Sequence, residues 1–271
     1  MARVRTTVGA VALAAAAMLA VAVVPMGASN QPAQAGGAVF QITHWKDPGT
    51  DKNVNHDHVV RWDPCQTITY AVNARKAGST PKARAAAIAD TQAAMGRAGE
   101  RTGMSFRYVG TTTEIPRDAA GASWTDRQRA AEIVIAWVKP GSATYGSNLL
   151  SQASGGYASG TGGWSWKAWT TASGQWRLAI GRGFVVINAD QNGSYRAGFG
   201  SGTTRGALLL HEVGHALGLN HVGATDELMY PTMLRRSHSS YKDGDQRGLS
   251  KLGRNAGCIG VTDAVWAPLP S

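Results

Sequence analysis

The alternation of apolar and polar positions predicts a domain that mixes strands and helices. Short β-branched and apolar runs are typical of strands, and they occur at 67–73, 104–109, 131–138 and 184–188. An alanine-rich stretch from 81 to about 101 predicts a long helix. Ser79 or Thr80 can cap its first turn, and Gly103 can end it.

Residues 141–182 break this pattern, because they are dense in Gly, Ser and Trp. Four tryptophans lie close together here, at positions 164, 166, 169 and 176. One interpretation is a long loop with an exposed hairpin that is held by aromatic packing. The other is a wall of a binding cleft, and the sequence leaves both open.

The first 35 residues have the layout of a secretory signal peptide, so we do not expect them in the fold. Arg3 and Arg5 precede an apolar, alanine-rich run at 8–24, and Ala33-Gln34-Ala35 offers a cleavage site of small residues. A membrane anchor is the alternative, but the run is short for a spanning helix and its alanines make it weakly hydrophobic. We therefore expect a secreted, extracellular protein that leaves the membrane once the signal peptide is removed.

Residues 36–57 are polar and carry turn-forming residues, so we expect a leader tail or short propeptide ahead of a folded domain at 58–271. Hydrophobic residues make up 43% of the chain, which excludes a disordered protein. The formal net charge of +10 comes from scattered Lys and Arg, which is typical of a solvated surface. We expect a monomer, and no nucleic-acid partner because export argues against one.

The two cysteines, Cys65 and Cys258, lie near opposite ends of the folded region. In an oxidising compartment the economical interpretation is a single disulfide. Such a bond would stabilise the fold by restricting the unfolded chain. The alternative is that one thiolate binds a metal ion and keeps an enzyme latent.

A helix capped by Thr203 or Thr204 is expected to carry the first half of the motif H-E-x-x-H-x-x-G-x-x-H. His211 and His215 are four residues apart, one turn above the other on one helix face, so both imidazoles can reach one zinc ion. Glu212 lies about 100° further round the helix. This position suits contact with a water molecule beside the ion rather than with the ion itself.

The third ligand requires the helix to end, because in a continuing helix His221 would face another side. Gly218 can take the left-handed conformation, which turns the chain so that His221 reaches the same ion. Three neutral histidines would leave the fourth position for water, as in catalytic zinc sites. A helix with surface histidines is the alternative, but its apolar neighbours at 208–210 make this a core helix, where uncompensated histidines are costly.

This extended motif resembles that of the metzincin zinc peptidases, and Leu-Met-Tyr-Pro at 228–231 resembles the Met-turn of their matrixin branch. The resemblance implies that Met229 lies beneath the zinc ligands. It also implies that Pro231, Thr232 and Met233 form the outer wall of the pocket just past the scissile bond.

The resemblance covers roughly 58–260 and implies an α+β, zincin-like fold. Its parts would be a twisted mixed β-sheet, a long N-terminal helix, the active-site helix and a C-terminal helix near 245–255. A strand or loop within 148–160 would supply the sheet edge that pairs with an extended peptide.

One catalytic Zn²⁺ ion is the cofactor that the resemblance implies. Vertebrate matrixins hold a second, structural zinc with histidines from the interval between His58 and His211, and this sequence has none there. We therefore expect that second ion to be absent. The turn Asp190-Gln191-Asn192-Gly193 offers oxygen ligands, but it is a weak calcium candidate because the full acidic loop is missing.

The implied activity is that of a secreted zinc-dependent endopeptidase that acts on protein or peptide substrates. Glu212 would take a proton from a zinc-activated water as general base and later hand a proton to the leaving amine. The alternative is a non-catalytic, zinc-stabilised extracellular binding module that uses the segment 141–182. Glu212 argues against this alternative, because a purely structural site needs no general base.

Overall fold

The computed structural model describes residues 40–46, 57–116, 130–141, 148–152, 155–170, 176–235 and 237–260. The predicted signal peptide at 1–35 lies outside these residues, and so do parts of the predicted propeptide. The described part of the structure also leaves out the side chains of Trp166, Trp169 and Trp176. The hypothesis that this segment forms a cleft wall therefore stays a prediction. Within the described residues, no helix combines the length and the apolar character needed to cross a bilayer.

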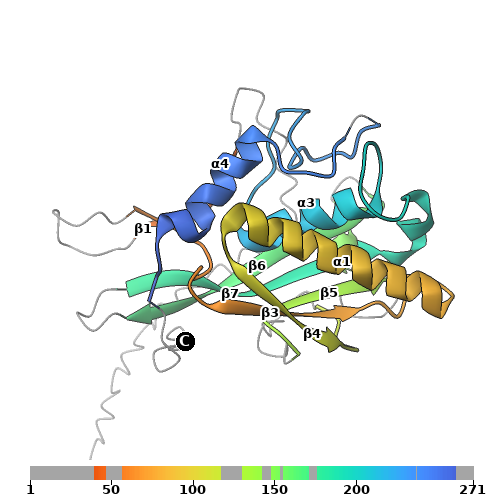
Figure 1. Cartoon of the computed structure of the whole chain (residues 1–271), viewed down its shortest axis with the longest axis horizontal. Coiled ribbons are helices and arrows are strands. Elements are labelled where there is room, and N and C mark those ends of the chain that lie inside the picture. The colour runs from red at the N-terminus through yellow and green to blue at the C-terminus, as the bar shows by residue number, and fades with distance from the viewer. Residues whose placement is uncertain are drawn as a thin grey trace, which may run out of the picture.

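A twisted sheet of five strands, in the order β4-β3-β5-β7-β6, forms the centre of the described structure (Figure 1). Its strands are β3 (Thr67–Asn73), β4 (Ser105–Thr111), β5 (Ile133–Val138), β6 (Gly160–Thr170) and β7 (Trp176–Asn188). Strands β4, β3, β5 and β7 are parallel, whereas β6 runs antiparallel to β7. The predicted α+β fold with a mixed sheet is thus confirmed.

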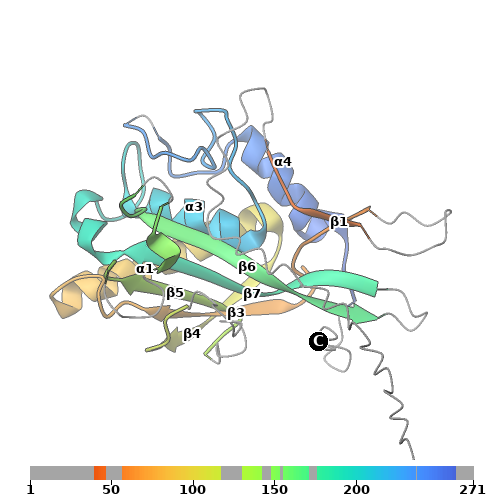
Figure 2. The ribbon, with the colours of Figure 1, turned by 180° about the vertical axis from the view of Figure 1, so that it is seen from behind.

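The helices lie on one face of this sheet, as the front and back views show (Figures 1 and 2). They are α1 (Pro81–Thr102), α3 (Arg205–Leu217) and α4 (Asp243–Leu252). The Thr80 side chain accepts a hydrogen bond from the Ala83 N–H, and Gly103 ends α1 with a φ of 68°, so both predicted ends are confirmed. Helix α4 ends earlier than predicted, at Leu252, and a short 3-10 turn, η3 (Arg254–Ala256), follows it.

The helix α3 is held between α1 and the sheet by one continuous apolar cluster. All 13 of its residues are buried. Strand β5 is buried on both faces, as its unbroken apolar sequence predicts. A smaller apolar cluster covers the opposite face of the sheet and consists of Ala136, Val138, Leu150, Phe184 and Val186. The helix that carries the histidine motif is therefore part of the core, which limits its movement.

The Trp- and Gly-rich segment contains an antiparallel hairpin, as one of the two interpretations predicted. Strands β6 and β7 pair from Gly160, opposite Ile187, to Thr170, opposite Trp176. The strand predicted at 184–188 is therefore the last part of a longer strand. The pairing with β6 extends β7 toward its N-terminal end. The periodicity of one strand does not show which other strand pairs with it.

The edge strand of the sheet beside α3 is β6, of which only the first residue, Gly160, lies within the predicted range 148–160. Peptide pairing within that range stays a prediction. The described part of that segment forms a short 3-10 turn, η1 (Asn148–Leu150), and one isolated bridge between Ser151 and Tyr157. The edge strand begins where the predicted range ends. The physical reason is the small residues at 160–163, which let the chain pass close to α3.

Part of the predicted propeptide is built into the fold. Strand β1 (His44–Lys46) pairs antiparallel with β2 (Asp57–Val59). The Thr43 carbonyl accepts a hydrogen bond from the Val60 N–H at 2.9 Å. The described residues ahead of position 58 therefore pair with the domain rather than trail away from it.

Cys65 and Cys258 form a disulfide, which confirms the predicted bond and leaves no free cysteine among the described residues. Beside the bond, the Asp63 carboxylate accepts hydrogen bonds from three backbone N–H groups, those of Cys65, Ile259 and Gly260. The chain before β3 is thus tied to the chain after η3. The alternative of a metal-binding thiolate is wrong, because neither sulfur is a free thiol.

Replacing both cysteines with serine is expected to lower the free energy of unfolding by about 2–5 kcal/mol. The unfolded chain would regain the freedom that a bond across 193 residues removes. Urea denaturation followed by tryptophan fluorescence measures the change. Zinc content serves as the control, since the cluster of three histidines lies elsewhere, and an unchanged free energy of unfolding would contradict the stabilising role.

Candidate metal centre

The two ends of α3 are set by local chemistry. The Thr204 side chain accepts a hydrogen bond from the Ala207 N–H at 3.2 Å and caps the first turn. Gly218 ends the helix in the left-handed conformation with a φ of 113°, and its N–H donates back to the Gly214 and His215 carbonyls. The chain therefore leaves the helix at the position that the motif predicts.

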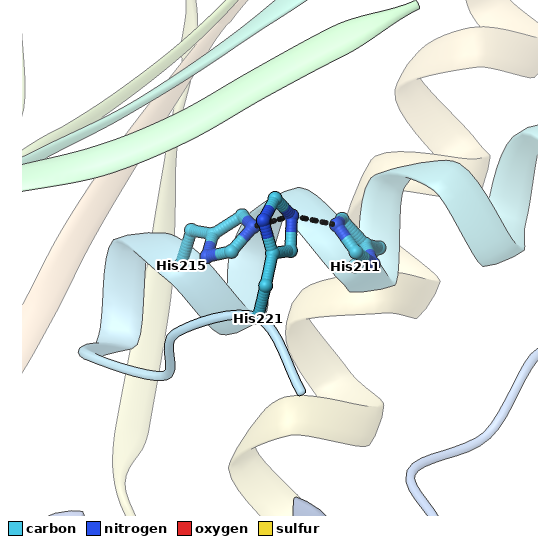
Figure 3. A group of neighbouring side chains, drawn as sticks. All are labelled: His211, His215 and His221. Atoms are coloured by element: carbon cyan, nitrogen blue, oxygen red, sulfur yellow. Dashed lines mark hydrogen bonds between the residues drawn. The ribbon is translucent and has the colours of Figure 1, made fainter. Parts of the chain in front are cut away.

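The turn after Gly218 brings the third histidine back to the other two (Figure 3). The Nε2 atom of His221 lies 3.2 Å from Nε2 of His211 and 3.0 Å from Nε2 of His215. The three ligand atoms all lie within 4.8 Å of one another, so the side chains form a group that could hold one metal ion.

Carbonyl groups behind the rings fix the orientation of two of these imidazoles. His211 Nδ1 lies 2.7 Å from the Leu228 carbonyl oxygen, and His215 Nδ1 lies 2.8 Å from that of Leu219. A carbonyl can only accept a hydrogen bond, so each Nδ1 carries the proton and each Nε2 presents a lone pair. The Nε2 atoms of His211 and His215 thus have free lone pairs on the side that faces His221, which fits a zinc site with histidine ligands.

Burial also favours the neutral form of these rings. It lowers the pKa of His211, although the hydrogen bond to Leu228 opposes the change. It lowers the pKa of His215 further below its ordinary value, and the neighbouring histidines add to the effect. Metal ions bind the neutral imidazole, so the electrostatics and the geometry agree.

Glu212 lies on α3 between His211 and His215 and faces the edge strand β6. Its side chain is buried, and this burial raises the pKa of the carboxyl group to about 8, against the opposing effect of a hydrogen bond from the Gly162 backbone. A bound cation nearby would favour the ionised carboxylate again. The carboxyl group can thus exchange a proton beside the group of three histidines.

Two glycines of β6 make this close approach possible, and neither was predicted from the sequence as part of the site. A Cβ atom at Gly160 would lie 2.8 Å from Glu212 Oε1, and one at Gly162 would collide with the Glu212 backbone oxygen. Glycine inside a strand often marks such an approach of two backbones. The run Gly-Thr-Gly-Gly therefore indicates a close approach of another backbone, although it does not indicate which helix approaches.

Met229 packs beneath the histidine helix. Its side chain is 1% exposed, and a Cβ atom at Gly214 would lie 2.6 Å from its sulfur. Gly214 sits between the two helical ligands, so the methionine lies against the segment that carries them. The preceding residue, Leu228, provides the carbonyl that orients His211.

A pair of buried carboxylates, Glu227 and Asp245, joins this turn to α4. Asp245 accepts a hydrogen bond from the Leu228 N–H at 2.7 Å and a longer one from Met229. In return, Glu227 accepts from the N–H groups of Gly244 and Asp245 in the first turn of α4. Burial and the Glu227 carboxylate raise the pKa of Asp245 to about 7. Neither acid was singled out from the sequence, because nothing local indicates their mutual contact.

The other predicted site residues are the proposed pocket wall and the proposed calcium turn. Pro231 and Thr232 are exposed, while Met233 is partly buried and packs against the main core. Their role as a pocket wall stays a prediction. In the turn predicted as a calcium site, Gln191 accepts a hydrogen bond from Ser159, and Asn192 accepts one from the Trp137 indole. Calcium binding there also stays a prediction.

Residues 159–253 of the chain match the family of matrixin peptidases. The chain carries a matrixin-type metzincin domain. The match spans β6, β7, α3 and α4, the elements that surround the three histidines. This match supports a zinc metallopeptidase domain, and a peptidase family implies protein or peptide substrates. No curated protein matches the chain significantly.

Proposed function

We propose that the matrixin domain is a secreted zinc endopeptidase with Glu212 as its general base. One observation carries the proposal: the helix that provides two of the three grouped histidines also holds a buried carboxyl group, that of Glu212, beside an edge strand. Ligands, base and a surface for an extended peptide are thereby adjacent. These are the three features that the proposed peptide hydrolysis would use.

The histidines His211, His215 and His221 would hold the ion through Nε2, because the Nδ1 atoms of the first two are engaged with carbonyls. Zinc, when bound, supplies Lewis-acid chemistry that polarises a carbonyl group and makes water more acidic. The Glu212 carboxylate accepts the proton of the attacking water and passes a proton to the leaving amine.

Strand β6 is the surface that supports peptide binding. It pairs with β7 along one edge, and within the described ranges no strand pairs with its other edge. An extended substrate can add there as a further strand through main-chain hydrogen bonds. Since Gly160 and Gly162 contact Glu212, a peptide on this edge would pass within reach of the base.

Secretion is supported by two independent features. Residues 1–35 have the layout of a signal peptide, and the disulfide between Cys65 and Cys258 requires an oxidising compartment to persist. Both features support the proposal that the endopeptidase is secreted.

The number of metal ligands favours catalysis over a purely structural zinc site. Structural sites are closed by four protein ligands, whereas catalytic sites keep one position open. In the part of the chain that the structure describes, the histidine group offers three ligand atoms. The alternative of a non-hydrolytic binding module would need neither the open position nor Glu212.

Removal of zinc is expected to abolish cleavage of casein or of a quenched fluorescent peptide library, and added zinc is expected to restore it. The metal-free protein is prepared with a chelator, and zinc content is measured beside turnover. Cleavage that persists in metal-free protein would contradict the zinc mechanism. A protein that binds one zinc ion yet cleaves nothing would instead favour the binding module.

A further inference from the structure

The segment at residues 40–43, which lies ahead of the predicted domain start, contacts the loop that carries the third metal ligand. We propose that this segment, the strap, remains on the mature protein and positions His215 and His221 for metal binding. The inference rests on the proposed zinc site, but it concerns residues outside the segment that matches the matrixins.

The strap pairs with the two residues that precede His221. Ile42 forms an antiparallel bridge with Leu219, and the Gln41 carbonyl accepts a hydrogen bond from the Asn220 N–H at 2.8 Å. Leu219 in turn provides the carbonyl that orients the ring of His215. Both residues that the strap holds therefore support a proposed metal ligand. Leu219 accepts a hydrogen bond from His215, and Asn220 directly precedes His221.

The strap is also wedged against α4. A Cβ atom at Gly248 of that helix would lie 2.6 Å from Leu219 Cδ2 and 3.1 Å from Phe40 Cβ. The missing side chain at Gly248 thus lets the strap and the loop lie side by side on α4. At its other end the strap is fixed by the hydrogen bond between Thr43 and Val60. The loop is consequently enclosed by α3, α4 and the strap.

Loss of the strap would loosen this loop, because the chain there has already left α3 at Gly218. The Asn220 N–H would lose its carbonyl partner, and Leu219, which is 2% exposed, would lose its apolar cover. A loop with more conformations holds the three Nε2 atoms together for a smaller fraction of the time, which lowers the apparent metal affinity by that fraction. Supporting groups around metal ligands typically contribute about 10–100-fold to affinity.

Cleavage of the N-terminal segment during maturation would therefore have to stop ahead of the strap. Processing that stops before Phe40 leaves the strap in place, whereas cleavage beyond Thr43 removes it. The second event would give a folded product with a weakened metal site. Proteolysis within the strap would then switch the enzyme off rather than on.

The test compares the chain that starts at residue 36 with one that starts at residue 44, and with the double variant Phe40→Ala/Ile42→Ala in the longer chain. Zinc affinity is measured by competition with a chromophoric chelator, using the metal alone. The absorption spectrum of the cobalt-substituted protein reports the ligand geometry independently of activity. Thermal unfolding of the metal-free proteins shows whether each variant is folded.

Both strap variants are expected to bind zinc about 10–100-fold more weakly and to show a changed cobalt spectrum while remaining folded. The matched control is Phe106→Ala, because Phe106 is partly buried against the same core but lies on β4. It is expected to lower the unfolding temperature without changing zinc affinity.

Zinc affinity within twofold of the longer chain, in a folded variant, would overturn the role of the strap. Failure of both strap variants to fold would also overturn it, because the segment would then stabilise the whole domain rather than position ligands. If the longer chain binds zinc but cleaves no peptide, the proposed endopeptidase function fails. The strap inference is still decided in that case by the affinity comparison.

Discussion

Replacing Glu212 with glutamine is expected to reduce peptide cleavage by about 10²–10⁴-fold, the usual contribution of a general base, while zinc stays bound. Glutamine keeps the size of the side chain, and its amide oxygen can still accept the hydrogen bond from the Gly162 backbone. It cannot accept and return a proton at neutral pH. The three histidines are untouched, so the metal site and the fold should persist.

The measurement is kcat/KM on a fluorescent peptide together with zinc content by elemental analysis. Glu100→Gln is the matched control, because Glu100 lies exposed on α1 and should leave turnover unchanged. Turnover by the Glu212 variant within tenfold of the parent would refute the assignment of the base. Loss of zinc would show instead that the carboxylate supports the metal site.

Replacing Gly162 with alanine is expected to destabilise the fold by about 1–3 kcal/mol, the usual cost of overpacking. The added methyl group would collide with the backbone oxygen of Glu212, which belongs to a buried helix and cannot swing aside. The collision can be relieved only if β6 and α3 move apart. Because α3 carries His211 and His215, the same displacement should weaken zinc binding.

The matched control is Gly96→Ala on α1, where no heavy atom lies within 4 Å of the new methyl group. This substitution should be neutral or stabilise the helix by about 0.5–1 kcal/mol. Gly160→Ala provides a contrast, since its methyl group would meet the mobile end of the Glu212 side chain and should lower activity more than stability. Urea denaturation and zinc competition compare the three proteins, and a Gly162 variant as stable as the Gly96 variant would contradict the packing argument.

The histidine group was predictable because its determinants are local. The spacing of His211 and His215 places them on one helix face, and Gly218 supplies the left-handed turn that returns His221. Each of these effects depends on residues within about two helical turns of one another. The caps at Thr80 and Thr204 follow the same logic, since a side chain and a backbone N–H three residues away suffice.

The supports of this centre were not predictable in the same way. Asp245 and Glu227 meet across 18 residues, and the Gly162 backbone meets Glu212 from another strand. The sequence around each of these residues does not indicate which distant residue it contacts. Sheet order has the same property, which is why the sequence did not show that the edge strand extends from Gly160 to Thr170.

Sequence alone determined the group of three histidines, the helix that carries the first two and the disulfide pair, because spacing, capping and the count of two cysteines are properties of the chain itself. Tertiary structure decided which strand lies beside Glu212 and that residues 40–43 hold the loop before His221. Those contacts join segments far apart in the chain. Their free energy comes from packing and from hydrogen bonds that exist only once the whole domain has assembled.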